Sequence, residues 1–378
     1  MKQTYLEALG IADQERVITQ SLAWLIGPDS PLAEFGRRTV IEALFGQGLP
    51  VDAPVVLTEL DRIDLALVWP KELIVAVEVK LKSRLGRTQI ADLNAAIDAL
   101  GMVDWLKGAG TKLPSRKFVL TFSGERVNDK TWGSLDFSQV SDVLSKVATA
   151  TKDPIVGDFA LLLARLLKAR DAFCTNHTEH PEVFGFSGAK TARLLEDHRK
   201  IANLPGDTGF IVRNKLSRIF IETLLWKAVD SAQVSKASVG ETRGQAQINV
   251  PLFEDIRFNA VAEDAFRTAL QYQAGAWKLQ VAAMDYSHSK AAWLNSTLSR
   301  DLDRSFADQR FKVNAGKTHA YRAWQLADKI DLPQTPLANF TDELRRKTLW
   351  ARDVWAKTLS AWQSAGLIQP GHTELGLR

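Results

Sequence analysis

The chain has little of several residue types whose abundance would point to a particular class of protein. It contains a single cysteine, Cys174, among 378 residues, which excludes an internal disulfide and suits a reducing cytoplasm. No stretch reaches the roughly 20 apolar residues that a membrane-spanning helix needs. The first residues, MKQTYLEALGIADQERV, lack the continuous apolar core of a secretory signal. We therefore expect a cytoplasmic protein that does not enter the membrane.

Several functional motifs are also missing from the sequence. There is no GxxxxGK loop, which argues against a nucleotide-hydrolysing motor, and there is no zinc-finger signature. What is present is the composition of an ordinary soluble protein, with 46% hydrophobic and 24% charged residues and a net charge of +4. The first 150 residues carry 17 Lys and Arg against 19 Asp and Glu, and the remainder carries 31 against 25. If a polyanion binds, the second half is expected to contribute much of the attraction.

The order of apolar patterns predicts an α/β core followed by a second domain. Three short strand-like runs and a fourth after an amphipathic helix make up the core, and the irregular HTEHPEVFGFSG marks a boundary after a further helix. Beyond it we expect helices and a small antiparallel sheet. Helices are predicted at 15–27, 31–46, 87–106, 155–172, 189–203, 210–231 and 340–366, and strands at 55–60, 62–69, 73–81, 116–124, 245–253, 256–263 and 277–286.

One apolar run raises a question about buried charge. The segment LIVAVEVKLKS has the composition of a strand inside a sheet, yet it carries Glu78 and Lys80. Because side chains alternate along a strand, these two point to the same face. A buried charge costs several kcal/mol unless a partner or a metal compensates it. The pair is therefore either a structural ion pair at a sheet edge or part of a site.

Asp64 is a third charged residue among apolar neighbours, in ELDRIDLAL. If its strand pairs with that of Glu78 as a hairpin, the two carboxylates lie side by side, and one of them takes up a proton unless a cation lies between them. Oxygen ligands suit Mg²⁺, or Mn²⁺ in its place, and the backbone carbonyl of Val79 would add a third oxygen. Lys80 would orient an attacking water and offset charge on a phosphate. The alternative for Asp64 alone is a salt bridge to Arg62 or Lys80.

These residues resemble those of a known family. The sequence RIDLALVWPKELIVAVEVKLKS, followed by TQIADL, looks like the PD-(D/E)xK nuclease superfamily, and more narrowly like bacterial members with a tE…RiD…iEnK…Q pattern. The upstream SLAWLIGPDSPLAEFG resembles a segment that often precedes the core in that group. The matching positions are Glu59 for the early acid, Arg62-Ile63-Asp64 for RiD, Glu78-Val79-Lys80 for ExK, and Gln89 for the glutamine.

The resemblance covers about residues 15–125 and implies both a fold and an activity. It implies a restriction-endonuclease-like core with a mixed central sheet flanked by helices. We therefore expect a nuclease-like domain over residues 1–175 and a mainly helical α+β domain over 185–378. The sequence departs from the family pattern where Ile63 replaces the proline before the first acid, and where Val79 replaces a frequent Asn.

The remaining candidates keep two interpretations each. Glu59 is either a distal metal ligand or a solvent-facing residue ahead of a turn, and Gln89 either contacts a phosphate or water or simply begins a helix. Glu34 and Glu42 are weaker candidates, because some members of the superfamily use an acid from the preceding helix. The basic stretch 187–218 would contact phosphates or form a solvated helical face.

Taken together, the sequence predicts a Mg²⁺-dependent nuclease, with DNA a better candidate than RNA and with a role in restriction, repair or anti-phage defence. A homodimer would supply the two sites that double-strand cleavage needs. The alternative is a catalytically inactive module of the same fold that binds nucleic acid or protein. The predicted catalytic residues are Asp64, Glu78, Lys80, Gln89 and Glu59, and the predicted metal ligands are Asp64, Glu78 and Val79.

Overall fold

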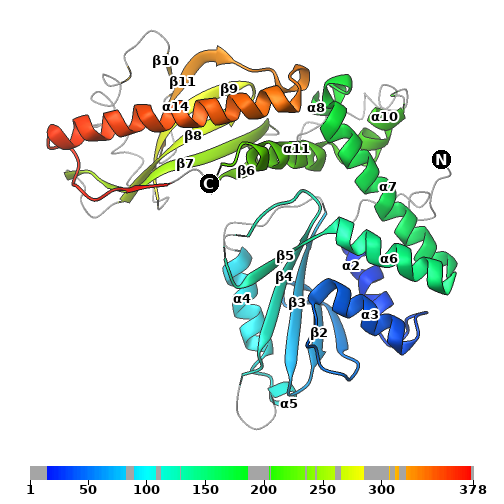
Figure 1. The fold of residues 1–378 in the computed structure, drawn as a ribbon. Helices are drawn as coiled ribbons and strands as arrows, with labels where there is room; N and C mark the ends of the chain where they lie inside the picture. The colour runs from blue at the N-terminus through cyan, green and yellow to red at the C-terminus, as the bar shows by residue number, and fades with distance from the viewer. Residues whose placement is uncertain are drawn as a thin grey trace. The chain divides into compact units, whose positions relative to one another are not determined.

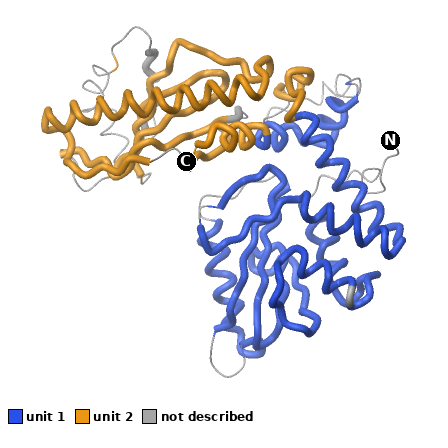
Figure 2. Tube along the Cα trace, in the orientation of Figure 1, with its two compact units in different colours: residues 1–173, 198–223 blue, residues 174–197, 224–378 orange. Residues whose placement is uncertain are grey.

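A computed structural model describes residues 15–81, 89–107, 112–127, 129–185, 204, 206–234, 236–242, 245–259, 265–284, 306, 311–314 and 321–375. The chain divides into two compact units, which Figure 2 colours separately. The first comprises Met1–Phe173 and His198–Thr223, and the second comprises Cys174–Asp197 and Leu224–Arg378. The division after residue 173 is close to the predicted boundary, but the segment 198–223 is part of the first unit.

The first unit is built on a five-stranded mixed sheet in the order β1-β2-β3-β4-β5. The first three strands run antiparallel to one another, and β4 and β5 join in parallel. Every residue of the central strand β3 is buried, which accounts for its long apolar run. The strands are β1 (Val55–Leu60), β2 (Ile63–Trp69), β3 (Leu73–Lys80), β4 (Ser115–Thr121) and β5 (Trp132–Asp136).

Helices cover both faces of this sheet (Figure 1). On one face, Leu93 and Ile97 of α4 pack into a core with Ala66, Ala76 and Val119. On the other side, α2 contacts α3 and the first three strands, and α3 contacts α6. The helices of the first unit are α2 (Glu15–Ile26), α3 (Glu34–Phe45), α4 (Gln89–Leu100), α5 (Asp104–Lys107), α6 (Phe137–Thr151) and α10 (Gly206–Arg213). Two further helices, α7 (Pro154–Asn176) and α11 (Ser217–Ser231), have residues in both units.

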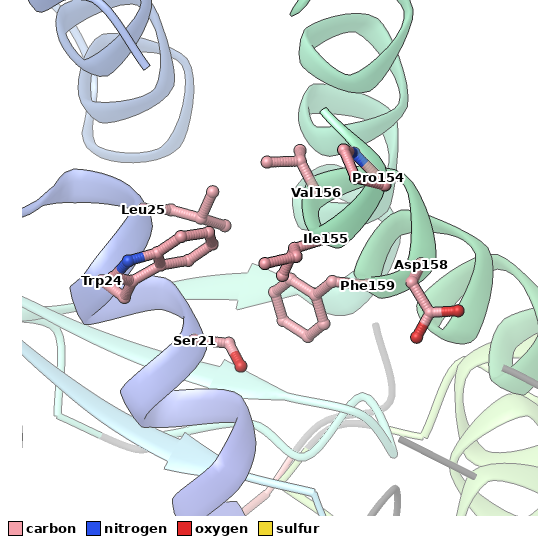
Figure 3. A pocket seen from close by; sticks show the side chains of 8 residues that line it. All are labelled: Ser21, Trp24, Leu25, Pro154, Ile155, Val156, Asp158 and Phe159. Atoms are coloured by element: carbon pink, nitrogen blue, oxygen red, sulfur yellow. The ribbon is translucent and has the colours of Figure 1, made fainter. Parts of the chain in front are cut away.

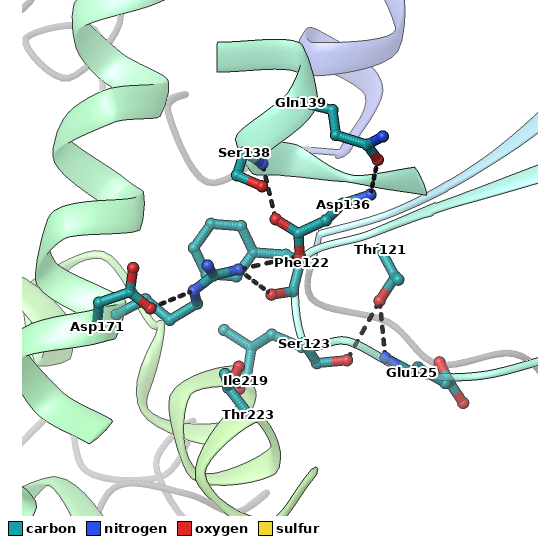
Figure 4. Close-up of polar contacts among 11 residues, drawn as sticks. Thr121, Phe122, Ser123, Glu125, Asp136, Ser138, Gln139, Asp171, Ile219 and Thr223 are labelled. Carbon is teal, nitrogen blue, oxygen red and sulfur yellow. Dashed lines mark hydrogen bonds and ion pairs between the residues drawn. The ribbon is translucent and has the colours of Figure 1, made fainter. Parts of the chain in front are cut away.

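Side chains hold the carboxyl ends of β4 and β5 in place (Figure 4). The Asp136 side chain accepts a hydrogen bond from the Ser138 amide, and the Gln139 side chain accepts one from the Asp136 amide, so that a capping box begins α6. Arg170 of α7 donates to the carbonyl of Phe122 at 2.8 Å and pairs with Asp136 at 3.3 Å. The end of β4, which lies next to the end of β3, is therefore fixed from two helices.

The second unit is centred on a seven-stranded antiparallel sheet in the order β10-β11-β9-β8-β7-β12, with β6 also paired to β7. The long helix α14 packs on β7 and β8. Phe340 of this helix lies edge-on to Tyr272 and stacks on Trp277. The elements are β6 (Ser238–Thr242), β7 (Gln245–Arg257), β8 (Ala265–Gln273), β9 (Ala276–Ala283), β10 (Phe311–Asn314), β11 (Tyr321–Lys329), α14 (Leu337–Ser364) and β12 (Thr373–Glu374), with the short helices η1 (His177–Glu179), α8 (Glu182–Gly185) and η4 (Leu332–Gln334).

The structure confirms a mixed α/β protein with a mixed sheet and flanking helices, and it corrects several expectations. Over its described residues the second unit is not mainly helical, because its sheet has seven strands and is larger than the sequence suggested. The helix expected over 210–231 is two helices, since Lys215 adopts a left-handed backbone with φ 55° that ends α10. Residues 256 and 257 complete β7 rather than beginning another strand. The helix expected over 189–203 lies outside the described residues.

Among the described helices, none is both long enough and apolar enough to cross a membrane.

Candidate functional site

The pairing of β2 with β3 brings two acidic side chains together. Leu65 lies opposite Val77 in the antiparallel register, so Asp64 and Glu78 occupy the next pair of positions. Glu78 and Lys80, two residues apart on β3, share the sheet face on which α4 packs. Both are buried, with 2% and 7% of their surface exposed. The expected convergence of the three polar groups is therefore what the structure shows.

Asp64 is held by the backbone of the neighbouring strand. Its Oδ2 accepts a hydrogen bond of 2.8 Å from the amide of Val79. The regular pairing of β2 with β3 stops at Leu65, so the carboxylate satisfies an amide that would otherwise lack a partner. The Val79 side chain is fully buried, which fits its predicted packing role. The role of its carbonyl as a ligand remains a prediction.

Glu78 has one oxygen that is satisfied and one that is not. Its Oε1 lies 2.5 Å from the Lys80 ammonium and accepts a hydrogen bond of 2.5 Å from the Gln89 side chain. Its Oε2 is buried and accepts no hydrogen bond from any residue that the structure describes. The carboxyl groups of Glu78 and Asp64 are within hydrogen-bonding reach of each other. A proton shared with Asp64, a bound water or a cation could satisfy that oxygen.

The environment disfavours two bare carboxylates. Burial raises the pKa of Glu78 to about 7, and the negative charge of Asp64 adds to the effect. Burial also raises the pKa of Asp64, although the Val79 amide and the Lys80 charge act in the opposite direction. Burial alone would lower the pKa of Lys80, but the hydrogen bond and charge of Glu78, with the charge of Asp64, outweigh burial and raise it.

This donor set fits a small divalent cation. If Asp64 and Glu78 are ionised and Lys80 is protonated, one negative charge stays uncompensated in a buried place. Two facing carboxylates with an unsatisfied oxygen are hard ligands of the kind that Mg²⁺ binds, usually with several waters. Among the described residues, no group of three or more His, Cys, Asp or Glu side chains is arranged to hold a metal. A cation here would therefore need the Val79 carbonyl and water in addition to the two carboxylates.

Gln89 and Glu59, the two uncertain candidates, have different outcomes. Gln89 is the first residue of α4, and its side chain contacts Glu78 directly. Glu59 lies level with Asp64 in the pairing of β1 and β2, but its φ of 54° interrupts the extended strand. Its carboxylate instead pairs with Arg16 at 2.9 Å and is largely exposed. Gln89 thus belongs to the cluster, whereas the structure shows Glu59 only in a surface ion pair.

The two weaker candidates on α3 are not brought to the cluster by any contact. Glu34 is exposed at the start of the helix. Glu42 pairs with Arg38 at 2.5 Å, and Arg38 also donates to the carbonyls of Leu49 and Pro50. Glu42 therefore has a structural role in holding the segment that follows α3.

One acidic residue near the cluster was missed by the sequence reasoning. Glu15, the first residue of α2, is close enough that its charge raises the pKa of both Asp64 and Lys80. The available signal was an acid at the first position of the first amphipathic helix, in ERVITQ. The sequence instead favours the acids of α3, because that helix directly precedes the strands.

The basic stretch 187–218 is described only in part. Residues 186–203 and 205 lie outside the described residues. Of the rest, Arg213 donates to the carbonyl of Leu204, and Arg218 pairs with Glu222 at 3.0 Å. These two arginines therefore have protein partners, and the proposed phosphate contact remains a prediction.

A pocket of about 310 Å³ lies apart from the acidic cluster (Figure 3). It is formed by α2 and the start of α7, and Figure 3 shows Trp24 and Ile155 on its two sides. The cluster residues Asp64, Glu78 and Lys80 do not line it. Its lining is Ser21, Trp24, Leu25, Pro154, Ile155, Val156, Asp158 and Phe159.

Comparison with protein-family models, with curated proteins and with solved structures gives no match.

Proposed function

We propose that the protein is a Mg²⁺-dependent nuclease that hydrolyses phosphodiester bonds, with DNA as the expected substrate. The observation that carries this proposal is the half-buried Asp64 beside the buried Glu78, which has an oxygen without a donor among the described residues and a lysine at 2.5 Å. A purely structural ion pair would need one acid, whereas the cluster has two that face each other. The resemblance to the PD-(D/E)xK superfamily assigns metal binding and catalysis to the same residues.

The residues of the cluster have separable roles in this proposal. Asp64 and Glu78 would hold the cation, together with the carbonyl of Val79. When bound, Mg²⁺ would polarise the phosphodiester and lower the pKa of a water ligand. Gln89 holds Glu78 by its Oε1, which leaves Oε2 as the ligand oxygen. Lys80, whose charge is favoured by both acids, would hold the attacking water and offset charge on the phosphate.

The first sheet supports a restriction-endonuclease-like core as part of the same proposal. It is mixed, it has helices on both faces, and its acidic cluster lies where the start of β2 meets the end of β3. The second unit would then bind the substrate or set its specificity, as the excess of basic residues in the second half of the chain suggests.

The test compares variants of the cluster with matched variants elsewhere in the unit. Purified protein is incubated with circular, linear and single-stranded DNA, and with RNA, with and without Mg²⁺ or Mn²⁺. Lys80→Ala and Glu78→Gln should abolish cleavage. Lys117→Ala and Glu42→Gln should not, because Lys117 binds Asn94 and Glu42 binds Arg38. Full activity in either cluster variant, with the fold intact, would remove the catalytic assignment.

A non-catalytic binding module of the same fold is the second candidate, and one observation favours it. The Glu78–Lys80–Gln89 contacts already form a closed hydrogen-bonded group. Calorimetric titration with Mg²⁺ and Mn²⁺ separates the two candidates. A nuclease should bind at millimolar concentrations or below and should lose binding in Glu78→Gln, whereas no binding by the wild-type protein would favour the second candidate.

A further inference from the structure

The turn between β1 and β2 has an unusual backbone for its sequence. Leu60 pairs with Ile63 across it, which leaves Asp61 and Arg62 as the two loop residues. Their φ angles are 43° and 75°, so both are left-handed, as in a type I′ hairpin turn. Such turns normally use Asn and Gly, because a left-handed residue with a side chain costs about 1 to 2 kcal/mol.

The strained turn is tied to the helix that carries a residue of the acidic cluster. Arg62 Nη1 lies 2.9 Å from Asp92 Oδ2 on α4. Asp92 is three residues beyond Gln89, which is one helical turn, and Gln89 donates to Glu78. Two residues after Arg62, the carboxylate of Asp64 accepts from the Val79 amide. One side chain therefore links the strand of Asp64 to the helix of Gln89.

We propose that Arg62 is a positioning residue, which sets Asp64 relative to Gln89 and Glu78 through its ion pair with Asp92. This inference rests on the proposed function, because it concerns the geometry of the same cluster. The Arg62–Asp92 pair is exposed, so its contribution to global stability is about 0 to 1 kcal/mol. Loss of this ion pair should leave the protein folded but should loosen the start of β2, where Asp64 lies. A displacement of about 1 Å in a catalytic group is enough to slow a reaction markedly.

The competing role for Arg62 is direct contact with a substrate phosphate, since its side chain is 69% exposed. The two roles differ in what Asp92 should do. If Arg62 acts through Asp92, loss of either residue gives the same defect, and loss of both gives no more than one. If Arg62 binds phosphate, loss of Asp92 leaves that contact in place.

The experiment measures the position of Asp64 without any substrate. Hydrogen exchange of the Val79 amide reports on its bond to Asp64 Oδ2. Arg62→Asn, which tolerates the left-handed backbone, and Asp92→Asn should each speed this exchange by about threefold to fivefold, and the double variant should add little. The exchanged pair Arg62→Asp with Asp92→Arg should restore part of the protection. Unchanged Val79 exchange in Arg62→Asn would overturn the proposal.

Kinetics on the cleaving protein completes the test. Arg62→Asn and Asp92→Asn should each lower kcat about tenfold with KM unchanged. A higher KM and a shallower salt dependence in Arg62→Asn alone would indicate phosphate contact and would also overturn the proposal. If the wild-type protein cleaves nothing, the nuclease proposal fails, but the exchange measurement still decides whether Arg62 positions Asp64.

Discussion

Each unit buries one lysine among its described residues, and the two lysines have different partners. Lys80 is 7% exposed and Lys347 is 4% exposed. Lys347 pairs with Asp328 at 2.9 Å and Glu343 at 3.8 Å, and its ammonium lies over the ring of Trp350. The Asp328 side chain is 73% exposed, so water solvates that acid. The lysine of the second unit therefore reaches an acid at the surface.

Lys80 has no such solvated partner in its cluster. Its ion-pair partner Glu78 is almost fully buried, and a second, half-buried acid, Asp64, lies beside the same carboxyl group. Ionising both acids would leave a net negative charge, and Glu15 adds more negative charge nearby. The comparison shows that burial of a lysine is not itself a sign of function. What distinguishes the Lys80 cluster is that its buried and half-buried acids, Glu78 and Asp64, outnumber the one lysine that could balance their charge.

The largest expected contrast is between Lys80→Met and Lys347→Met. Lys80→Met should lose all detectable cleavage, because the variant lacks the group that holds the water and balances the phosphate charge. Lys347→Met should cleave at the wild-type rate and should change the free energy of unfolding by about 1 kcal/mol or less, since its acids remain solvated. Cleavage assays and urea unfolding of both variants check this. Equal activity in the two would end the distinction between the clusters.

A second contrast appears in the pH dependence of stability without metal. The folded-state pKa of Glu78, about 7, lies above its ordinary value of 4.5, so the folded protein holds this proton more tightly than the unfolded chain does. The resulting stabilisation is complete below pH 4.5 and is lost as the pH rises through 7. It should decrease by about 1.4 kcal/mol per pH unit, or about 3 kcal/mol in all.

Urea unfolding in the presence of a chelator, between pH 4.5 and 7.5, measures this effect. Because other groups also titrate, the quantity of interest is the difference between the wild-type protein and Glu78→Gln, which lacks the titrating carboxyl. The wild-type protein should lose more stability than the variant across the window. Parallel curves would show that the Glu78 proton is not held more tightly in the folded state.

A third and smaller effect concerns Glu15, whose charge acts on the cluster from α2. Glu15→Gln should lower the pKa of Asp64 and of Lys80, because the charge of Glu15 raises both. We expect the cleavage rate to change by about threefold or less, because the charge of Glu15 is only a minor contribution to either pKa. Glu34→Gln is the matched control, since Glu34 is an exposed acid at the start of the neighbouring helix. A pH–rate profile for both variants would show whether the change follows titration of the cluster.

Much of the first sheet could be predicted from the sequence, because its buried strands are short apolar runs separated by turn residues. The convergence of Asp64, Glu78 and Lys80 followed from strand periodicity and a hairpin. Strand β5, with the sequence WGSLD, was missed because it has only five residues, and its two buried residues, Trp132 and Leu135, do not follow the alternation of a strand. Such a strand depends on pairing with β4 rather than on its own pattern.

The parts that could not be predicted depend on local backbone and on distant partners. Glu59 matched a motif position, but its backbone is left-handed and its carboxylate forms an ion pair with Arg16 at the surface. Glu15 lies far from Asp64 in sequence, and only the packing of α2 on the sheet brings its charge near. Lys215 divides the apolar pattern over 210–231 into two helices, because this non-glycine residue adopts a left-handed φ that the sequence does not signal.

The smallest expected effect comes from an ion pair that matches the Lys80–Glu78 pair in length but not in burial. Lys112 and Asp98 are also 2.5 Å apart, but their side chains are 45% and 51% exposed. Water solvates both groups whether or not they pair, so Asp98→Asn should change the free energy of unfolding by less than about 0.5 kcal/mol and leave cleavage unchanged. Urea unfolding and the cleavage assay measure both quantities beside Glu78→Gln. A large loss of stability or activity in Asp98→Asn would mean that contact distance, rather than the removal of water, governs the strength of these ion pairs. Burial would then no longer distinguish the Glu78–Lys80 pair from an ordinary surface pair.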